Sequence, residues 1–423
     1  MTELKRMKPA AICLGSVCVI VLVVVALVHV LRKPVTAGKA AVTNEVVRAG
    51  DQVMASVPTL ANCDLGVTNL QFEEIAPGVA YARGQLASPP LVYHVVKADL
   101  ARKGLRVGVL QPGITSSGAK QKITNMVNDA ATDLESAVAA INGDYYAFGV
   151  AGPWGIHLQQ KKLYYSPTGK SALLVDESGL PLIAIPTCSI TVQLDADPQV
   201  YPVVDFNRPS GVEAVPGLHL FGYAKEFADV SSLAGAAVIE AVQPGVDGVV
   251  TGVVTKVVEA GQKVQLPANG LVLSCNGTGK DYPGGVLKVG ARIAIRTVIT
   301  PSASEAIGGG PRIVKGGKPS LEFDKETFST SHAGYLHGRH PRSAVGISED
   351  RKTVIMLVAV GRRASSPGMT VDELARLLVE LGSWDAMMFD GGGSAVMYTR
   401  KHNLVNKSKG RSLCNALGIF VAR

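Results

Sequence analysis

The stretch from Asp385 to Tyr398 constrains the fold of this chain more than any other part of the sequence. It reads as a buried strand that ends at Asp390, followed by three glycines, Ser394 and a second short apolar run. Glycine has no Cβ atom, so the backbone N–H groups of such a turn are open to a ligand. A turn that only requires positive φ angles is the alternative. Because an acidic residue ends the strand, we favour a functional site at this position.

A helix is predicted just before this strand. Thr370 and Glu373 have the spacing of a capping box, leucines recur at helical spacing as far as Leu381, and Gly382 is a natural stop. The order of helix, strand and glycine turn is typical of a unit that carries a site at the carboxyl end of its strand.

A similar order of elements occurs earlier in the chain. Apolar residues at helical spacing from 123 to 130 predict an amphipathic helix, and residues 137–141 predict a short buried strand. That strand ends in Asn142, Gly143 and Asp144. Two strand ends that each present a carboxylate beside glycine are a candidate for paired-acid chemistry. A hairpin turn at Asn142 and Gly143 is the alternative.

These patterns predict an α+β fold, with a mixed β-sheet and packed helices. Residues 187–300 differ from the rest because they form short β-like runs separated by Gly, Pro and Asn, which indicates an inserted β-rich subdomain. Residues 76–186 and 301–423 are then the two parts of one domain that the insertion interrupts.

The N-terminal region predicts a membrane anchor. Ala11 to Leu31 is apolar and long enough to span a bilayer, and basic residues precede it. We therefore predict a cytoplasmic tip and single-pass transmembrane anchor in residues 1–33 and a linker in residues 34–75, with the catalytic domain outside the cytoplasm. A cleaved signal peptide, which would leave a secreted or periplasmic protein, is the alternative.

Charge and cysteine content narrow the function classes. The formal net charge is +8, but six basic residues and one acidic residue lie within the first 40 positions. The remainder has no long basic run and no aromatic–basic interleaving, so we do not expect nucleic-acid binding. The four cysteines beyond the apolar segment are too dispersed for a zinc site. They could form two disulfides or remain four free thiols, and both alternatives stay open. They are Cys63, Cys188, Cys275 and Cys414.

Six short motifs, taken together and in order, resemble the phosphodiester glycosidase family. They cover residues 141–146, 307–317, 340–348, 368–382, 389–398 and 404–420. The resemblance extends from about residue 90 to the C-terminus. It implies a hydrolase that cleaves a glycosyl 1-phosphodiester, with N-acetylglucosamine as one candidate sugar, in an envelope or exported glycan.

The resemblance and the motifs together define a set of candidate site residues. The candidate catalytic residues are Asp144, Asp390 and Arg342. The candidate substrate- or phosphate-binding residues are Asn142, Gly309, Gly310, Arg362, Gly391, Gly392, Gly393, Ser394, Arg411 and Asn415. No cluster has convincing metal-ligand spacing, so no cofactor is expected, although a divalent cation between Asp144 and Asp390 stays open.

One position departs from the family pattern. Relatives usually have Asp-Gly-Arg at the end of one strand. In this chain the corresponding residues are Val360, Gly361 and Arg362, so the acid is missing. The missing acid keeps a second function class open, a non-catalytic protein that binds a polyanionic glycan with the same residues.

The chemistry of a sugar phosphodiester assigns roles to these groups. Its transition state resembles an oxocarbenium ion, which a carboxylate stabilises, and the leaving phosphate needs cationic or N–H donors more than a strong acid. We expect the glycines and arginines to hold the phosphate. Asp144 is farther from the 391–393 turn in sequence, so we expect it to face the anomeric carbon.

Overall fold

The computed structural model describes residues 70–87, 89–113, 120–146, 152–208, 217–222, 227–229, 235–244, 248–259, 263–276, 287–321, 323–326, 333–406 and 410–422. All of them lie within the compact unit Asp64–Arg423.

The largest sheet has eight antiparallel strands in the order β1-β2-β3-β23-β22-β24-β20-β21. Segments far apart in sequence therefore become neighbours, and the predicted site strand lies inside the sheet between β22 and β20. The strands are β1 (Glu73–Ala76), β2 (Val79–Ala87), β3 (Pro90–Asp99), β20 (Arg312–Lys315), β21 (Lys318–Pro319), β22 (Arg342–Ile347), β23 (Thr353–Ala359) and β24 (Asp385–Phe389).

A second antiparallel sheet has the order β26-β25-β5-β27-β4. Its strands are β4 (Leu105–Leu110), β5 (Glu135–Asn142), β25 (Met397–Thr399), β26 (Asn403–Leu404) and β27 (Ala416–Ala422). One hydrophobic core joins the two sheets, because side chains such as Val138 and Leu417 of the second sheet pack with Val345 and Met387 of the first. Strand β24 is buried on both faces, because Met387 and Phe389 lie in this core while Ala386 and Met388 pack with other apolar residues on the opposite face, and this explains its run of apolar residues.

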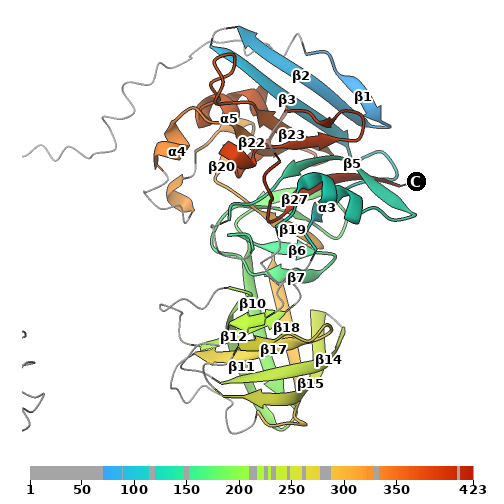
Figure 1. Cartoon of the computed structure of the whole chain (residues 1–423), viewed down its shortest axis with the longest axis vertical. Coiled ribbons are helices and arrows are strands. Elements are labelled where there is room, and N and C mark those ends of the chain that lie inside the picture. Colours follow the sequence, from blue (N-terminus) through green and yellow to red (C-terminus); the bar gives the residue numbers. More distant parts are fainter. Residues whose placement is uncertain are drawn as a thin grey trace, which may run out of the picture. The chain divides into compact units, whose positions relative to one another are not determined.

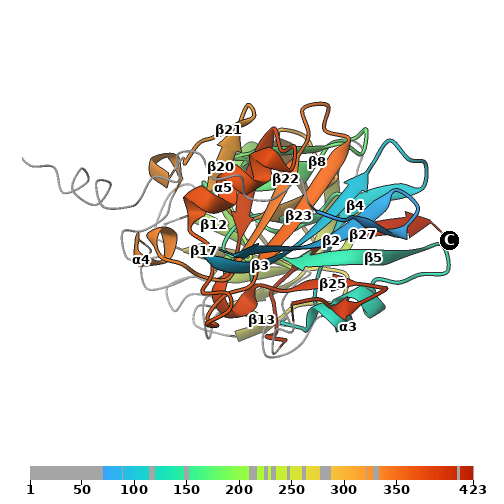
Figure 2. The same ribbon diagram turned by 90° about the horizontal axis from the view of Figure 1, so that it is seen from above.

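Short helices cover the outer faces of these sheets. α5 (Val371–Glu380) packs its leucines against the eight-stranded sheet, and α3 (Ile123–Asp129) packs against the second sheet beside β5 (Figure 2). The other helical elements are α4 (Ala333–His337) and the 3-10 turns η3 (Phe323–Lys325) and η5 (Gly392–Ser394).

The remaining strands form a third sheet and a closed barrel, both labelled in Figure 1. The third sheet has the order β7-β6-β19-β8-β9, and the barrel has the order β10-β11-β12-β17-β14-β15-β18. The bounds of the sheet strands are β6 (His157–Gln159), β7 (Lys162–Tyr165), β8 (Ala172–Val175), β9 (Pro181–Ala184) and β19 (Glu305–Gly308). Those of the barrel strands are β10 (Thr187–Leu194), β11 (Asp197–Phe206), β12 (Gly217–Gly222), β14 (Ala236–Pro244), β15 (Val249–Val258), β17 (Leu271–Asn276) and β18 (Arg292–Thr300). A separate pair joins β13 (Phe227–Asp229) to β16 (Lys263–Gln265).

The predicted α+β fold is wrong, because the described chain is mostly β. Its three α-helices have five, seven and ten residues, whereas strands occupy most of the described length. Glycine-rich turns allow many short strands to reverse direction, so that segments with no helical periodicity pair as strands. The barrel strands all lie within residues 187–300, the range predicted for the insertion, and the domain boundaries themselves stay a prediction.

The predicted membrane-anchored localisation is also corrected. Within the described ranges, no helix is long and apolar enough to cross a membrane. The longest, α5, has ten residues, about half the length that a bilayer requires. The segment Ala11 to Leu31, on which the prediction rested, lies outside the described residues.

Two of the four cysteines are described as free thiols, Cys188 and the buried Cys414. Cys63 and the side chain of Cys275 lie outside the described part of the chain.

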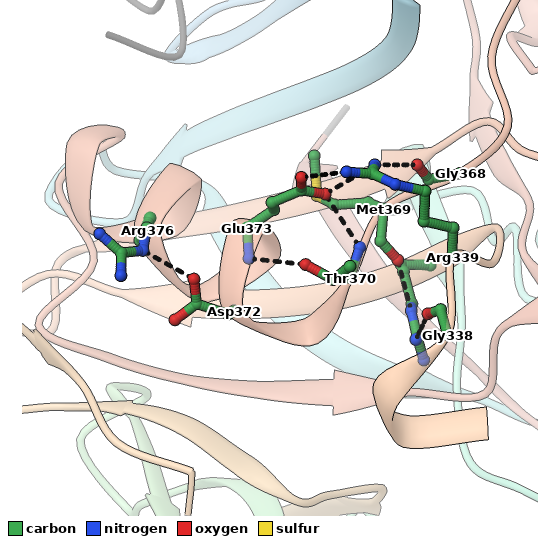
Figure 3. Close-up of polar contacts among 9 residues, drawn as sticks. Gly338, Arg339, Gly368, Met369, Thr370, Asp372, Glu373 and Arg376 are labelled. Carbon is green, nitrogen blue, oxygen red and sulfur yellow. Dashed lines mark hydrogen bonds and ion pairs between the residues drawn. The ribbon is translucent and has the colours of Figure 1, made fainter. Parts of the chain in front are cut away.

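Helix α5 begins with the predicted capping box, which is confirmed. The Glu373 N–H donates to Thr370 Oγ1 at 3.2 Å, and the Thr370 N–H donates to Glu373 Oε2 at 3.0 Å (Figure 3). Arg339 Nη1 also donates to this carboxylate at 2.9 Å and to the carbonyl oxygen of Gly368 at 3.0 Å. The helix start is therefore tied to the segment that leads into β22.

Replacing Thr370 with Ala should lower the free energy of unfolding by about 1 kcal/mol, because the helix loses its N-terminal acceptor. The matched control is Asp372→Asn, which removes the exposed pair with Arg376 and one carboxylate of the first helical turn, and which should cost about 0.5 kcal/mol or less. Urea denaturation measures both. Equal losses in the two variants would contradict a specific role for the cap.

Candidate active site

The two predicted carboxylate turns lie in direct contact, although they follow strands of different sheets. The N–H of Asp390, after β24, donates to the carbonyl oxygen of Gly143, after β5, at 2.9 Å. The side-chain Nδ2 of Asn142 donates to the carbonyl oxygen of Asp390 at 2.6 Å. The structure therefore brings the neighbourhoods of Asp144 and Asp390 together.

Asn142 holds this junction in place. Its Oδ1 accepts from Ser343 Oγ at 2.7 Å and from the Val396 N–H at 3.0 Å, and the residue is fully buried. The side-chain amide is thus committed to the protein on both sides. Asn142 has the contacts of a positioning residue rather than of a substrate ligand.

Asn415 plays a similar part for Asp144. Its Oδ1 accepts from the Asp144 N–H at 2.8 Å, and its carbonyl oxygen accepts from the Gly143 N–H at 3.1 Å. Asn415 is fully buried. It orients the 143–144 backbone.

Asp144 is enclosed by backbone. Its Oδ1 accepts from the Tyr145 N–H at 2.7 Å and its Oδ2 from the Gly155 N–H at 2.5 Å. A Cβ atom at Gly308 would lie 2.4 Å from Oδ2, so only glycine fits beside this carboxylate. Burial raises the pKa of Asp144 to about 7, against the opposing effect of those N–H groups and of Arg208 and Lys170.

Asp390 is less enclosed than Asp144. Burial raises its pKa to about 6, while the Ser394 hydroxyl, Arg411 and the Gly391 N–H lower it. Ser394 is close enough to affect the carboxyl but does not complete a hydrogen bond of good geometry. Asp390 is therefore the less buried and less tightly hydrogen-bonded of the two acids.

Arg362 and Arg411 both lie against the glycine turn. A Cβ atom at Gly392 would be 3.2 Å from Arg362 Nη2, and one at Gly393 would be 2.9 Å from Arg411 Nη2. Both arginines are exposed, and Arg362 has a φ of 61°, a conformation that residues other than glycine seldom adopt. Two guanidinium groups thus border the turn from segments distant in sequence.

Arg342, in contrast, is fully buried. Its Nε donates to the carbonyl oxygen of Met369 at 3.0 Å, and its Nη2 donates to those of Tyr335 and Gly338 at 2.7 and 2.6 Å. Its guanidinium also lies 4.7 Å from the centre of the Tyr335 ring. These contacts fix the segment 335–338 and the end of the 368–369 loop, so most of the Arg342 donors are used within the protein.

Three buried polar atoms near Asp390 complete no hydrogen bond within the described ranges. They are Arg342 Nη1, Tyr335 Oη and Ser394 Oγ. The Tyr335 oxygen would lie 2.3 Å from a Cβ atom at Gly391, which places it against the turn. Buried polar groups are normally paired, so these atoms indicate a place for a polar ligand.

In the second glycine run, Gly308 to Gly310, every backbone N–H already donates a hydrogen bond. The N–H groups of Gly308, Gly309 and Gly310 donate to the carbonyl oxygens of Ile156, Ser171 and Met388 at 2.8, 3.1 and 2.8 Å. We therefore do not retain Gly309 and Gly310 as phosphate contacts. Gly309 instead allows close packing, because a Cβ atom there would lie 2.5 Å from the Met388 carbonyl oxygen.

Sequence reasoning missed three residues beside these acids: Tyr335, Lys170 and Arg208. Arg208 follows the barrel strand β11 and donates to the carbonyl oxygens of Pro153 and Gly155 at 2.8 and 2.9 Å. None of the three lies in a recognisable motif, so the sequence carried no local signal for them. Among the described residues, no group of three or more His, Cys, Asp or Glu side chains is arranged to hold a metal ion.

Comparison with known proteins finds a family resemblance over part of the chain. Residues 244–420 match the phosphodiester glycosidase family. The resemblance seen in the motifs is thereby confirmed over this range, which includes Arg342, Arg362, Asp390 and Arg411 but not Asp144. No curated protein matches the chain.

Three solved structures are similar to this chain. A hypothetical protein from Synechocystis has a TM-score of 0.68 at 19% identity, and the match covers 83% of this chain and 64% of that one. A putative exported protein from Burkholderia pseudomallei K96243 has a TM-score of 0.58 at 17% identity, covering 78% and 74%. The zebrafish N-acetylglucosamine-1-phosphodiester alpha-N-acetylglucosaminidase catalytic domain, auto-inhibited by its pro-peptide, has a TM-score of 0.43 at 12% identity, covering 83% of each chain. The likeness to the Synechocystis and Burkholderia proteins concerns the fold alone, and the chain spans less than two thirds of the Synechocystis protein.

The raised pKa of Asp144 predicts how stability depends on pH. Between the unfolded value near 3.9 and the folded value near 7, the folded protein holds a proton that the unfolded chain has lost, so stability should fall as pH rises through this window. Over this window the free energy of unfolding should fall by about 4 kcal/mol at most.

Asp144→Asn should remove the part of the pH dependence of stability that comes from ionisation of Asp144. Urea denaturation of both proteins from pH 4 to pH 8 should therefore show a stability difference that changes with pH. A difference that stays constant would mean that Asp144 is ionised in the folded protein throughout.

Proposed function

We propose that the chain is a hydrolase that cleaves a glycosyl 1-phosphodiester of an envelope or exported glycan, with N-acetylglucosamine a candidate sugar. One observation carries this proposal. The Gly391–Gly393 turn is bordered by Arg362 and Arg411 and directly follows the carboxylate of Asp390. Two guanidinium groups that are suited to a phosphate thus adjoin a carboxylate.

The phosphate group is proposed to lie over the glycine turn. Arginine is suited to this role because its planar guanidinium donates two parallel hydrogen bonds to phosphate oxygens. Ser394 Oγ and Tyr335 Oη add neutral donors at the same turn. Donors already held in place stabilise the charge that develops on the leaving phosphate without reorganisation during the reaction.

Asp390 is proposed to be the carboxylate that faces the anomeric carbon, in place of Asp144. Both oxygens of Asp144 accept backbone N–H groups and glycines enclose it, whereas Asp390 is less buried and follows directly into the turn that two exposed arginines border. In its ionised form Asp390 would stabilise positive charge on the sugar ring as the bond from the anomeric carbon to the phosphate oxygen breaks. Water then adds to the anomeric carbon, and a phosphomonoester leaves.

Asp144 is proposed to support Asp390 indirectly. Through its two N–H donors it fixes the residues that follow Gly143, and the Gly143 carbonyl oxygen accepts the Asp390 N–H. Displacing this backbone would displace Asp390.

The direct test is hydrolysis of a panel of sugar 1-phosphodiesters by the full chain. Release of a reducing sugar and a phosphomonoester is the expected result. Tight binding without turnover, measured by calorimetry on the same panel, would favour the alternative of a non-catalytic glycan-binding protein, for which the acid missing at Val360 is the argument.

Asp390→Asn should reduce turnover by several orders of magnitude with little change in substrate binding, because the shape remains and the charge is lost. Asp144→Asn should reduce turnover less, since its effect is indirect. Steady-state kinetics of both variants on the best substrate decides between them. A larger loss for Asp144→Asn would reverse the proposed roles.

Arg411→Gln should weaken substrate binding and also change the pH profile. In the wild-type protein, kcat/KM should rise with pH through about 6 as Asp390 ionises. Arg411 lowers the pKa of Asp390, so its removal should move this rise to higher pH. Arg363→Gln, at a neighbouring exposed arginine without contact to the turn in the structure, is the matched control. An unmoved profile in Arg411→Gln would show that another group controls it.

A further inference from the structure

The end of barrel strand β11 is fastened to the third sheet by hydrogen bonds. Asn207, which follows the strand, is fully buried, and its Nδ2 donates to the carbonyl oxygen of Tyr164 in β7 at 2.8 Å. The Phe206 N–H donates to Ser166 Oγ at 3.1 Å, just after the same strand. These bonds fix the position of the next residue, Arg208, relative to the third sheet.

Arg208 holds the segment 153–155 from this position. Its Nη1 donates to the carbonyl oxygen of Pro153 at 2.8 Å, and its Nη2 donates to that of Gly155 at 2.9 Å. A guanidinium group is planar and its donors have fixed directions, so the two bonds set both the distance and the orientation of this backbone. A lysine would supply the charge without this fixed geometry.

The segment that Arg208 holds is also the one that contacts Asp144. The Gly155 N–H donates to Asp144 Oδ2 at 2.5 Å, and the Trp154 N–H donates to the carbonyl oxygen of Tyr145 at 2.9 Å. Gly155 thus binds Asp144 through its N–H and Arg208 through its carbonyl oxygen. A displacement of Arg208 would reach the acid through this one glycine.

Two features of this junction are unfavourable for stability. Arg208 Nε is buried and completes no hydrogen bond within the described ranges, although buried donors are normally paired. Asn207 has a φ of 58°, in the left-handed region that asparagine tolerates better than most residues but still seldom adopts. Unfavourable backbone angles cluster at functional sites. Both features favour a functional role for Arg208 over a purely structural one.

We propose that Arg208 is a positioning residue of the candidate active site, and that the barrel contributes to the reaction through it. This inference rests on the proposed function, in which Asp144 supports Asp390. Arg208 holds Gly155, and Gly155 holds Asp144. The residue before Asp144, Gly143, accepts the Asp390 N–H through its carbonyl oxygen. Arg208 therefore acts on Asp390 without contact to the substrate.

The charge of Arg208 also acts on Asp144. Burial raises the pKa of this carboxyl, and the charges of Arg208 and Lys170 oppose that effect together with the backbone N–H groups. The Tyr145 hydroxyl and the Cys414 thiol also interact with it, but burial raises both of their pKa values well above the ordinary range, so both are neutral. Substitution separates the two effects of Arg208, since Arg208→Gln removes the charge and the planar pair of donors, whereas Arg208→Lys keeps the charge.

Steady-state kinetics on the best sugar 1-phosphodiester tests the positioning role. Arg208→Lys and Arg208→Gln should each lower kcat about tenfold or more with little change in KM, because a small displacement of the acid is felt in the transition state. The matched control is Arg296→Gln, at an exposed arginine of barrel strand β18, which should keep the wild-type kcat. Wild-type kcat in Arg208→Lys, or a raised KM with unchanged kcat, would overturn the proposal.

Urea denaturation tests the link between Arg208 and Asp144 without any substrate. At pH 8, where Asp144 is largely ionised, Arg208→Gln should lower the stability of the wild-type protein more than that of Asp144→Asn. The pH window in which stability falls should extend to higher pH in Arg208→Gln, since the folded pKa of Asp144 rises, and should stay in place in Arg208→Lys and Arg296→Gln. Additive losses and an unmoved window would reject the link.

The two measurements fail independently. If the wild-type protein hydrolyses no sugar 1-phosphodiester, the proposed function fails. Non-additive losses in urea would then still establish that Arg208 acts on Asp144. Conversely, hydrolysis by the wild-type protein together with additive losses would retain the proposed function and reject the role of Arg208.

Discussion

The hydrogen bond from the Asp390 N–H to the Gly143 carbonyl oxygen is the contact on which the rest of the site depends. It joins the ends of two strands that belong to different sheets and lie almost 250 residues apart in the chain. Asn142 reinforces it by donating to the Asp390 carbonyl oxygen while accepting from Ser343 and Val396. Because these groups are buried, each unmade hydrogen bond would cost free energy, and the junction has one favourable arrangement.

Small residues allow the layers to approach closely enough for this contact. Gly155 and Gly308 leave just enough room for the Asp144 carboxylate, and Gly309 allows its backbone to approach that of Met388. The price is two acids in poorly solvated positions, which raises both of their pKa values. The N–H groups of Tyr145 and Gly155, together with nearby cations, offset part of this cost for Asp144.

The two sides of the junction differ in what remains available to a ligand. On the Asp144 side the carboxylate oxygens accept backbone N–H groups. Within the described residues, buried donors are unpaired near both acids, Arg208 Nε near Asp144 and groups of Ser394, Tyr335 and Arg342 near Asp390, but exposed arginines border the turn beside Asp390. This asymmetry is the reason to assign substrate chemistry to one acid and support to the other.

Part of the site followed from the sequence because its signals are local. The capping box of α5, the strand that ends at Asp390 and the glycine turn each depend on residues a few positions apart, and the ordered motifs indicated the family that residues 244–420 match. The α+β fold was wrong because short strands without clear periodicity are recognised only once their partners are known. The same limit applied to Tyr335 and Arg208, which lie in no motif.

The sequence alone therefore determined which residues stand at the two strand ends and which chemistry their side chains can perform. Only the tertiary structure decided that these ends meet, that Arg342 is buried under Tyr335, and that the N–H groups of Gly308, Gly309 and Gly310 are already used. The physical reason is the same in each case. A hydrogen bond or the burial of a charge depends on partners brought together from distant segments, and no local pattern specifies them.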